Sequence, residues 1–198
     1  MRRLSLTSFA FAFTQLCFVT FLVSYLTLEL ALSLATAAAI LAGSQVVSTA
    51  ARIIWGHVGD RWVDPACLLG LLGLSMAAAC AGLGLLDPGT GGGMGMGLIV
   101  ATAAVCAATA MGWNGVFFAE LAHKAGRSEM AAIAGASQFF TFCGSMSGPV
   151  VYAEIIRHGG SYGAAYLSLA LLPGLAGLAM LRAAYRAAGN SPAGDAQS

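Results

Sequence analysis

The sequence predicts an all-α integral membrane protein with six transmembrane helices. Three observations support this fold class: charged residues are scarce, six long runs contain none of them, and the basic residues between the runs fall in a regular order. Only 9% of the 198 residues are charged and 59% are hydrophobic, with a mean hydropathy of +0.82. A soluble domain carries about 25% charged residues, so most of this surface is expected to face lipid.

Six runs lack Asp, Glu, Lys and Arg, and each is longer than the roughly 20 helical residues that cross a bilayer core. They cover residues 4–28, 30–51, 66–86, 90–119, 130–153 and 161–181. Backbone polar groups in lipid must be satisfied within the segment, so helices are expected. The predicted spans are about 4–28, 30–55, 66–86, 94–119, 130–155 and 161–182. They form one domain, residues 1–186, followed by a disordered cytoplasmic tail, residues 187–198.

Individual runs carry further local signals. The first is too long for the apolar region of a signal peptide, about 7–15 residues, and is interpreted as a retained helix. A loose outer loop over residues 89–97 is expected before the fourth helix. On the fifth, the spacing of Gly144 and Gly148 favours close approach of another helix. Pro149 and Pro173 lie inside the fifth and sixth spans, where kinks are tolerated.

The basic residues predict the orientation. With six crossings, eight of the nine fall on one side of the membrane: Arg2, Arg3, Arg52, Arg61, Lys124, Arg127, Arg182 and Arg186. Only Arg157 falls on the other side. Cytoplasmic loops carry the Lys and Arg excess, so we expect a multi-pass protein of the cell (inner) membrane with both termini in the cytoplasm. Interfacial aromatic residues are expected at both ends: Tyr25, Tyr152 and Tyr162 outside, and Trp55, Trp62, Trp113 and Tyr185 inside.

Composition also excludes several functions. The net charge of +1 and the absence of a basic cluster argue against nucleic-acid binding. Five separated cysteines without a C-x-x-C pair predict neither a zinc site nor a redox motif, and they are interpreted as small packing residues. No metal and no cofactor is expected.

Residues 56–61 read GHVGDR, at the predicted boundary between the second helix and the cytoplasmic loop that follows. This resembles the signature G-x-x-x-D-R-x-G-R-R of the major facilitator superfamily, which lies in the loop between helices two and three and recurs, degenerate, between helices eight and nine. Here residues 62–65, WVDP, replace the second part, which favours the C-terminal half. Residues 112–115 (GWNG) with 119–121 (AEL) resemble the end of the tenth helix. Gly148-Pro149 with residues 159–162 (GGSY) is similar to the family's last turn.

The resemblance implies a six-helix half bundle of two three-helix repeats, belonging to a secondary transporter that works by alternating access. It also implies a cytoplasmic latch between the two halves. Gly56 would permit close helix approach, Asp60 would accept from free N–H groups at a neighbouring helix start, and Arg61 would pair with a carboxylate or an anionic lipid. Arg52 and Glu120 complete the proposed latch. The alternative is that Asp60 and Arg61 are ordinary loop charges.

Four amide side chains are the candidates for lining a substrate cavity: Gln15, Gln45, Asn114 and Gln138. By the family's arrangement, the first, second, fourth and fifth helices face that cavity. The alternative is that each amide bonds a neighbouring helix. No ionisable residue lies deep in a span, which places any proton-coupling group in a partner half or favours a neutral or amphipathic small solute.

Two other classes of membrane protein are alternatives to a transporter. An intramembrane serine protease would need a base beside Ser145 or Ser147, and no histidine lies at membrane depth, so the chain is not predicted to be an enzyme. The other alternative is a structural or channel-forming membrane subunit. A channel usually has a polar stripe that lines its pore, and no such stripe is evident in the sequence.

One six-helix bundle cannot enclose a site that the family builds between two halves. The chain is therefore expected to form a homodimer, to pair with a separately encoded half, or to be a truncated, non-functional fragment whose Met1 was once internal. The last two are favoured, because Arg2 and Arg3 resemble the end of the family's central linker. An upstream reading frame with six more spans would decide among them.

Overall fold

The structure is a computed structural model that describes residues 2–87, 89, 94–124 and 130–189. Within these residues every long element is helical and no strand occurs. In chain order the helices are α1 (Arg2–Leu28), α2 (Leu34–Arg61), α3 (Pro65–Gly84), α4 (Met94–Lys124), α5 (Met130–Arg157), α6 (Tyr162–Leu169) and α7 (Leu171–Gly189).

Six helical segments are long and apolar enough to cross a membrane, since α6 and α7 together make one span, Tyr162–Ala187. For the described part of the chain, this confirms the predicted number of helices able to cross a membrane. The helices are longer than several predicted spans, because α2, α4 and α5 continue to Arg61, Lys124 and Arg157. Of the expected loop 89–97, residues 94–97 already belong to α4, and residues 90–93 lie outside the described residues.

Local chemistry sets several helix ends. The backbone of Ala31 turns with φ 55°, and Ser33 then caps α2 by accepting from the amide of Thr36, so α2 begins four residues later than the expected span. Pro173 has no N–H to bond the carbonyl of Leu169, and its ring crowds that turn. The last span breaks there, at Ala170, into α6 and α7.

The expected tail, residues 187–198, begins inside α7, which continues to Gly189. Unlike Pro173, Pro149 lies inside an unbroken helix, α5. The remainder of the tail, residues 190–198, lies outside the described residues.

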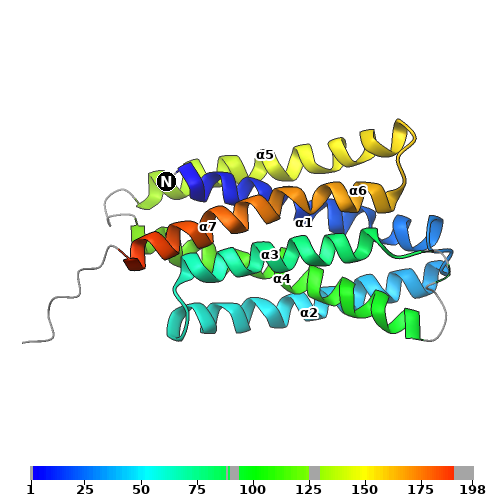
Figure 1. The fold of residues 1–198 in the computed structure, drawn as a ribbon, viewed down its shortest axis with the longest axis horizontal. Helices are drawn as coiled ribbons and strands as arrows, with labels where there is room; N and C mark the ends of the chain where they lie inside the picture. The colour runs from blue at the N-terminus through cyan, green and yellow to red at the C-terminus, as the bar shows by residue number, and fades with distance from the viewer. Residues whose placement is uncertain (1, 88, 90–93, 125–129, 190–198) are drawn as a thin grey trace, which may run out of the picture.

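The helices pack mainly in three pairs: α1 with α5, α2 with α4, and α3 with the α6–α7 span. α3 also packs on α4, and α1 on α7, α4 and α2. Figure 1 shows the start of α1, the turn between α2 and α3 and the end of α7 at one end of the bundle, with the turn between α5 and α6 at the other. The helix ends that carry the basic residues, except Arg157, therefore lie together.

Glycine lets α1 and α5 touch backbone to backbone. A Cβ at Gly144 would lie 2.3 Å from the carbonyl oxygen of Phe9, and one at Gly148 would lie 2.6 Å from that of Phe13. The predicted close approach through this glycine pair is therefore present, and its partner helix is α1.

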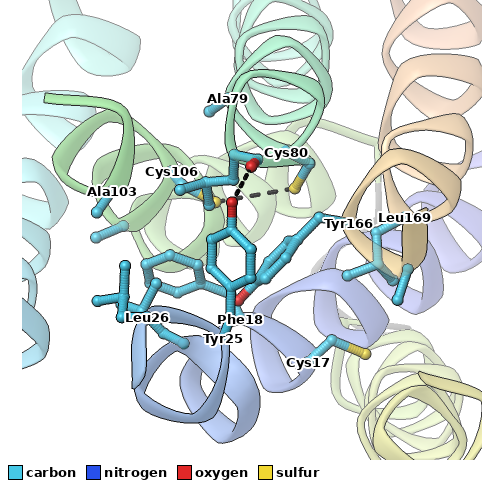
Figure 2. Close-up of a cluster of buried hydrophobic side chains, with 14 of the residues drawn as sticks. Cys17, Phe18, Tyr25, Leu26, Ala79, Cys80, Ala103, Cys106, Tyr166 and Leu169 are labelled. Atoms are coloured by element: carbon cyan, nitrogen blue, oxygen red, sulfur yellow. Dashed lines mark hydrogen bonds between the residues drawn. The ribbon is translucent and has the colours of Figure 1, made fainter. Parts of the chain in front are cut away.

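The buried side chains form two clusters along the bundle. One surrounds Tyr25, Tyr152 and Tyr166, and the other surrounds Phe11 and Trp113. In the first cluster the rings of Tyr25 and Tyr166 are 5.1 Å apart, and Figure 2 shows them among side chains from several helices. Three of the five cysteines (Cys17, Cys80 and Cys106) are buried here, and all five are free thiols, in line with a packing role.

Burial differs strongly between helices. In the most apolar stretch of each span, 56% of the residues of α1 and of α3 are buried, against 28% for α2 and 17% for α5. Large apolar side chains such as Val46 and Ile53 on α2, and Met146 and Val150 on α5, are more than 60% exposed. α2 and α5 therefore present the least covered apolar surfaces of the six spans.

Candidate functional site

Gln15 is held between α1 and α4. Its side-chain oxygen accepts a hydrogen bond from the indole N–H of Trp113, at 3.1 Å, and that indole is 1% exposed. A buried Trp needs such an acceptor. The bond gives Gln15 a structural role in joining two helices, and its side chain remains half-buried rather than enclosed.

The other three amides are also half-buried. Asn114 donates to the carbonyl of Met111 on its own helix, at a long 3.4 Å. Within the described part of the chain, the side chains of Gln45 and Gln138 have no hydrogen-bond partner. These two amides, unlike Gln15, are therefore available to bond something other than the described bundle.

The four amides do not share one level. Gln15 accepts from Trp113, and Asn114 follows Trp113 on α4, so Gln15 and Asn114 lie at a similar height along the bundle. Gln45 lies seven residues, about two turns, before Arg52, which contacts Met111. Gln138 follows Ser137, whose carbonyl accepts from Ser8, about two turns from Gln15 toward the start of α1. The structure thus places Gln15 and Asn114 at a similar height, with Gln45 about two turns to one side of that level and Gln138 about two turns to the other.

α2 is attached to α4 by two side chains that reach helix carbonyls. The Arg52 Nε donates to the carbonyl of Met111 at 3.1 Å, and the Trp55 indole donates to that of Ala108 at 3.0 Å. The indole covers Gly112, where a Cβ would lie 2.4 Å from Trp55 Cδ1. Arg52 therefore joins two helices inside this bundle, and the partner of Trp55 could not have been inferred from spacing alone.

The proposed latch residues at the end of α2 have few contacts. Asp60 and Arg61 are exposed, and a Cβ at Gly56 would meet nothing within 4 Å. The carboxylate that caps the start of α3 belongs to Asp64, which accepts from the amide of Cys67 at 3.1 Å. At the start of α3 the capping carboxylate is therefore Asp64 and not Asp60. The sequence contained that signal, because Asp followed by Pro is typical of a helix start.

Glu120 is more deeply buried than its place near the end of a span suggested. Its side chain is 3% exposed and forms an ion pair with Lys124, one turn later on α4. A buried carboxylate without a partner would be costly, so Lys124 compensates it locally. In this structure the side chain of Glu120 is buried inside the helix bundle.

The opposite end of the bundle holds residues that sequence reasoning missed. Glu29, after α1, accepts from the amide of Gly163 at the start of α6, at 3.0 and 3.2 Å from its two oxygens. A side chain on Gly163 would collide with Glu29 and with the carbonyl of Gly84, each 2.9 Å from its Cβ. No local pattern predicts a cap 134 residues away in sequence.

Two tyrosines expected at the outer interface are also part of this end. Tyr25 and Tyr152 are fully buried, and their hydroxyls donate to the carbonyls of Leu83 and Tyr162 respectively. They join helices rather than facing lipid headgroups. Trp113 is likewise buried, whereas Trp62 and Tyr185 are 76% and 82% exposed, as interfacial residues would be.

The serine pair considered for a protease lies on α5. The Ser147 hydroxyl donates to the carbonyls of Cys143 and Gly144, at 2.7 and 3.3 Å. Such bonds to the preceding turn are usual for serine in membrane helices. Among the described residues no group of three or more His, Cys, Asp or Glu side chains is placed to hold a metal ion.

Comparison of the sequence with protein-family models and with curated proteins finds no match. The resemblance to the major facilitator superfamily therefore depends on the short motifs of this chain and on their positions in the bundle.

Proposed function

We propose that the chain is one six-helix half of a transporter of the major facilitator type, and that it moves a small solute across the membrane by alternating access. Both termini lie in the cytoplasm in this proposal. The observation that carries it is the pairing of the helices: α1 with α5, α2 with α4, and α3 with α6–α7.

This pairing is what two inverted three-helix repeats would produce. If α1 is exchanged with α4, α2 with α5, and α3 with α6–α7, the pair α1·α5 becomes α4·α2, and the third pair maps onto itself. The partners of each exchange are three places apart in the order of the six spans. Because three is an odd number, they cross the membrane in opposite directions. Inverted repeats of this kind are built into each half of the superfamily's transporters. The exchange also relates α2 to α5, the two least buried spans.

The uncovered surfaces of α2 and α5 support contact with a second six-helix half. Gly43 and Gly56 on α2 and Gly135 on α5 have open space where a Cβ would stand. Exposed glycines in membrane helices allow another helix to approach closely. The second half would be a separate chain or another copy of this one, and the substrate would bind between the halves near the middle of the bilayer.

The candidate cavity residues are uncharged amides, which favours a neutral or amphipathic solute. Gln45 and Gln138 lie on α2 and α5, the helices whose surfaces are least covered, and neither has a side-chain partner within the described residues. Each can offer both a donor and an acceptor to a solute. Gln15 and Asn114 would contribute less, because Gln15 already serves Trp113.

Thiol accessibility tests the proposal without knowledge of the substrate. Gln45→Cys would be made in a chain whose five native cysteines are replaced by serine or alanine, and expressed in its native membrane. A membrane-impermeant maleimide is then applied to right-side-out and to inside-out vesicles. Alternating access predicts that position 45 reacts from both sides, because one site opens to each in turn.

The matched control is Val105→Cys. Val105 lies six residues before Met111, as Gln45 lies seven before Arg52, so the two are at similar depth, and Val105 is 48% exposed. It is expected to face lipid and to react from neither side. If position 45 behaves like position 105, Gln45 lines no water-filled cavity and the transport proposal loses its main support.

A further inference from the structure

A groove runs between α1 and α7 at the end of the bundle that carries the basic residues. Its apolar part is a cavity of about 350 Å³ whose lining includes Leu6 and Ala10 on α1 and Leu175 and Ala179 on α7. It adjoins a second cavity of about 450 Å³, lined by Arg2, Arg3, Leu4, Lys124, Met180 and Ala183. Arg3 lines both cavities, so the apolar groove leads into a basic pocket.

The dimensions of the groove fit a lipid chain. On α7 the lining residues extend from Leu172 to Ala183 in steps of three and four residues, which forms one continuous stripe. Eleven residues at 1.5 Å each cover about 16 Å, which is about half of the roughly 30 Å hydrocarbon core. The stripe is therefore about as long as the hydrocarbon part of one leaflet is thick.

The charges at the mouth of the groove favour an anion. Arg2 and Arg3 stand in the first turn of α1, which contains no acidic residue, and a helix N-terminus is itself positive. Within the described residues neither arginine is paired with a carboxylate. Lys124 is paired with Glu120, which does not line the pocket. The two arginines thus supply most of the uncompensated positive charge.

We propose that this groove binds an anionic phospholipid, with the phosphate between Arg2 and Arg3 and one acyl chain along the α1–α7 stripe. A basic pocket between helices at the cytoplasmic surface is a known form of site for anionic headgroups. A free phosphate would use only the basic pocket, whereas a phospholipid fills both cavities. The occupant is therefore a lipid of the bilayer.

The test uses the full chain, purified in detergent, with dioleoyl phosphatidylglycerol or dioleoyl phosphatidylcholine added and bound lipid counted by native mass spectrometry. The unaltered chain should prefer phosphatidylglycerol. Arg2→Gln with Arg3→Gln should weaken that binding about 25-fold, because each basic side chain near an anionic lipid contributes about a factor of five. Arg2→Lys with Arg3→Lys keeps both charges and should bind within about threefold of the unaltered chain.

The matched control is Arg182→Gln with Arg186→Gln. It removes the same charge from exposed residues at the same end, and neither residue lines the groove. Equal losses in the two double variants would mean general surface attraction and would overturn the site.

Two further results would also overturn it. One is displacement of phosphatidylglycerol by millimolar inorganic phosphate, which would indicate a free-anion site. The other concerns Ala179→Trp, whose large side chain should block the apolar groove. Phosphatidylglycerol binding by this variant that equals that of the unaltered chain would overturn the site. Thermal unfolding of each variant in detergent confirms that the compared proteins are folded.

Discussion

At the scale of single residues, the tightest contacts of this bundle occur where a side chain is missing. Gly144 and Gly148 bring α5 against the backbone of α1, and Gly112 admits the indole of Trp55. In lipid, helices gain little from burying apolar surface, so close packing and hydrogen bonds carry their association. These glycines therefore contribute to the association of the helices, because a side chain at any of them would prevent the close contact.

Gly144→Ala is expected to destabilise the protein by about 1–3 kcal/mol, the usual cost of overpacking. The added Cβ would lie 2.3 Å from the carbonyl oxygen of Phe9, a backbone atom that no rotamer change can move. The free energy of unfolding, measured by denaturant titration in mixed micelles, checks this. The control is Gly135→Ala on the same helix, where the Cβ meets nothing within 4 Å. It should be neutral or slightly stabilising, and equal effects would contradict the α1–α5 contact.

Glu29→Ala is expected to lower the free energy of unfolding by about 1 kcal/mol, as the loss of a helix cap does. The Glu29 carboxylate accepts from the start of α6 and so joins the first span to the last. Glu154→Ala is the control, because Glu154 lies at the same end and is 49% exposed in a surface ion pair with Arg157. That change should alter stability by less than about 0.5 kcal/mol. A Glu29 variant as stable as the control would show that the cap contributes nothing.

Residue-level predictions from sequence worked where the signal was local. The glycine spacing on α5 identified a close contact, and Asp64-Pro65 contained a recognisable helix start. Glu29, Trp55 and the buried hydroxyl of Tyr25 bond residues 53 to 134 positions away, and nothing near them in sequence names those partners. The depth of Glu120 was likewise set by tertiary packing.

At the scale of elements, hydropathy located all six spans but not their ends. A helix continues past the apolar core wherever its next residues can still form backbone bonds, as α2 does to Arg61 and α4 to Lys124. A run without charged residues therefore marks only the apolar part of a helix and not its full length. The break in the last span depends instead on Pro173, whose missing N–H leaves the turn at Ala170 open.

Pro173→Ala is expected to close that break. The new amide at position 173 can donate to the carbonyl of Leu169, as the amide of Gly174 already donates to that of Ala170 at 3.2 Å. Hydrogen exchange in micelles checks this, with Gly174 as the internal reference. Protection at position 173 should approach that of Gly174. Exchange at the rate of an unbonded amide would mean that packing of α6 and α7 on α3, rather than the proline, holds the break open.

At the scale of the whole molecule, the three helix pairs and the shared position of the basic helix ends belong together. An even number of crossings returns the chain to the side where it began, and Figure 1 shows the start of α1 and the end of α7 at the same end of the bundle. The distribution of Lys and Arg along the sequence predicted that the two termini lie at the same end. It could not predict the pairing, because which helices touch depends on side-chain shape across the bundle.

The most direct test is the location of the two ends of the last span. A fluorescent protein that folds only in the cytoplasm, and a phosphatase active only outside it, are each fused after Ser198 and, separately, inserted after Gly159 between α5 and α6. Six crossings with a cytoplasmic N-terminus predict fluorescence without phosphatase activity after Ser198, and phosphatase activity without fluorescence after Gly159. Phosphatase activity at the carboxyl terminus would contradict the topology and, with it, the proposed half-transporter.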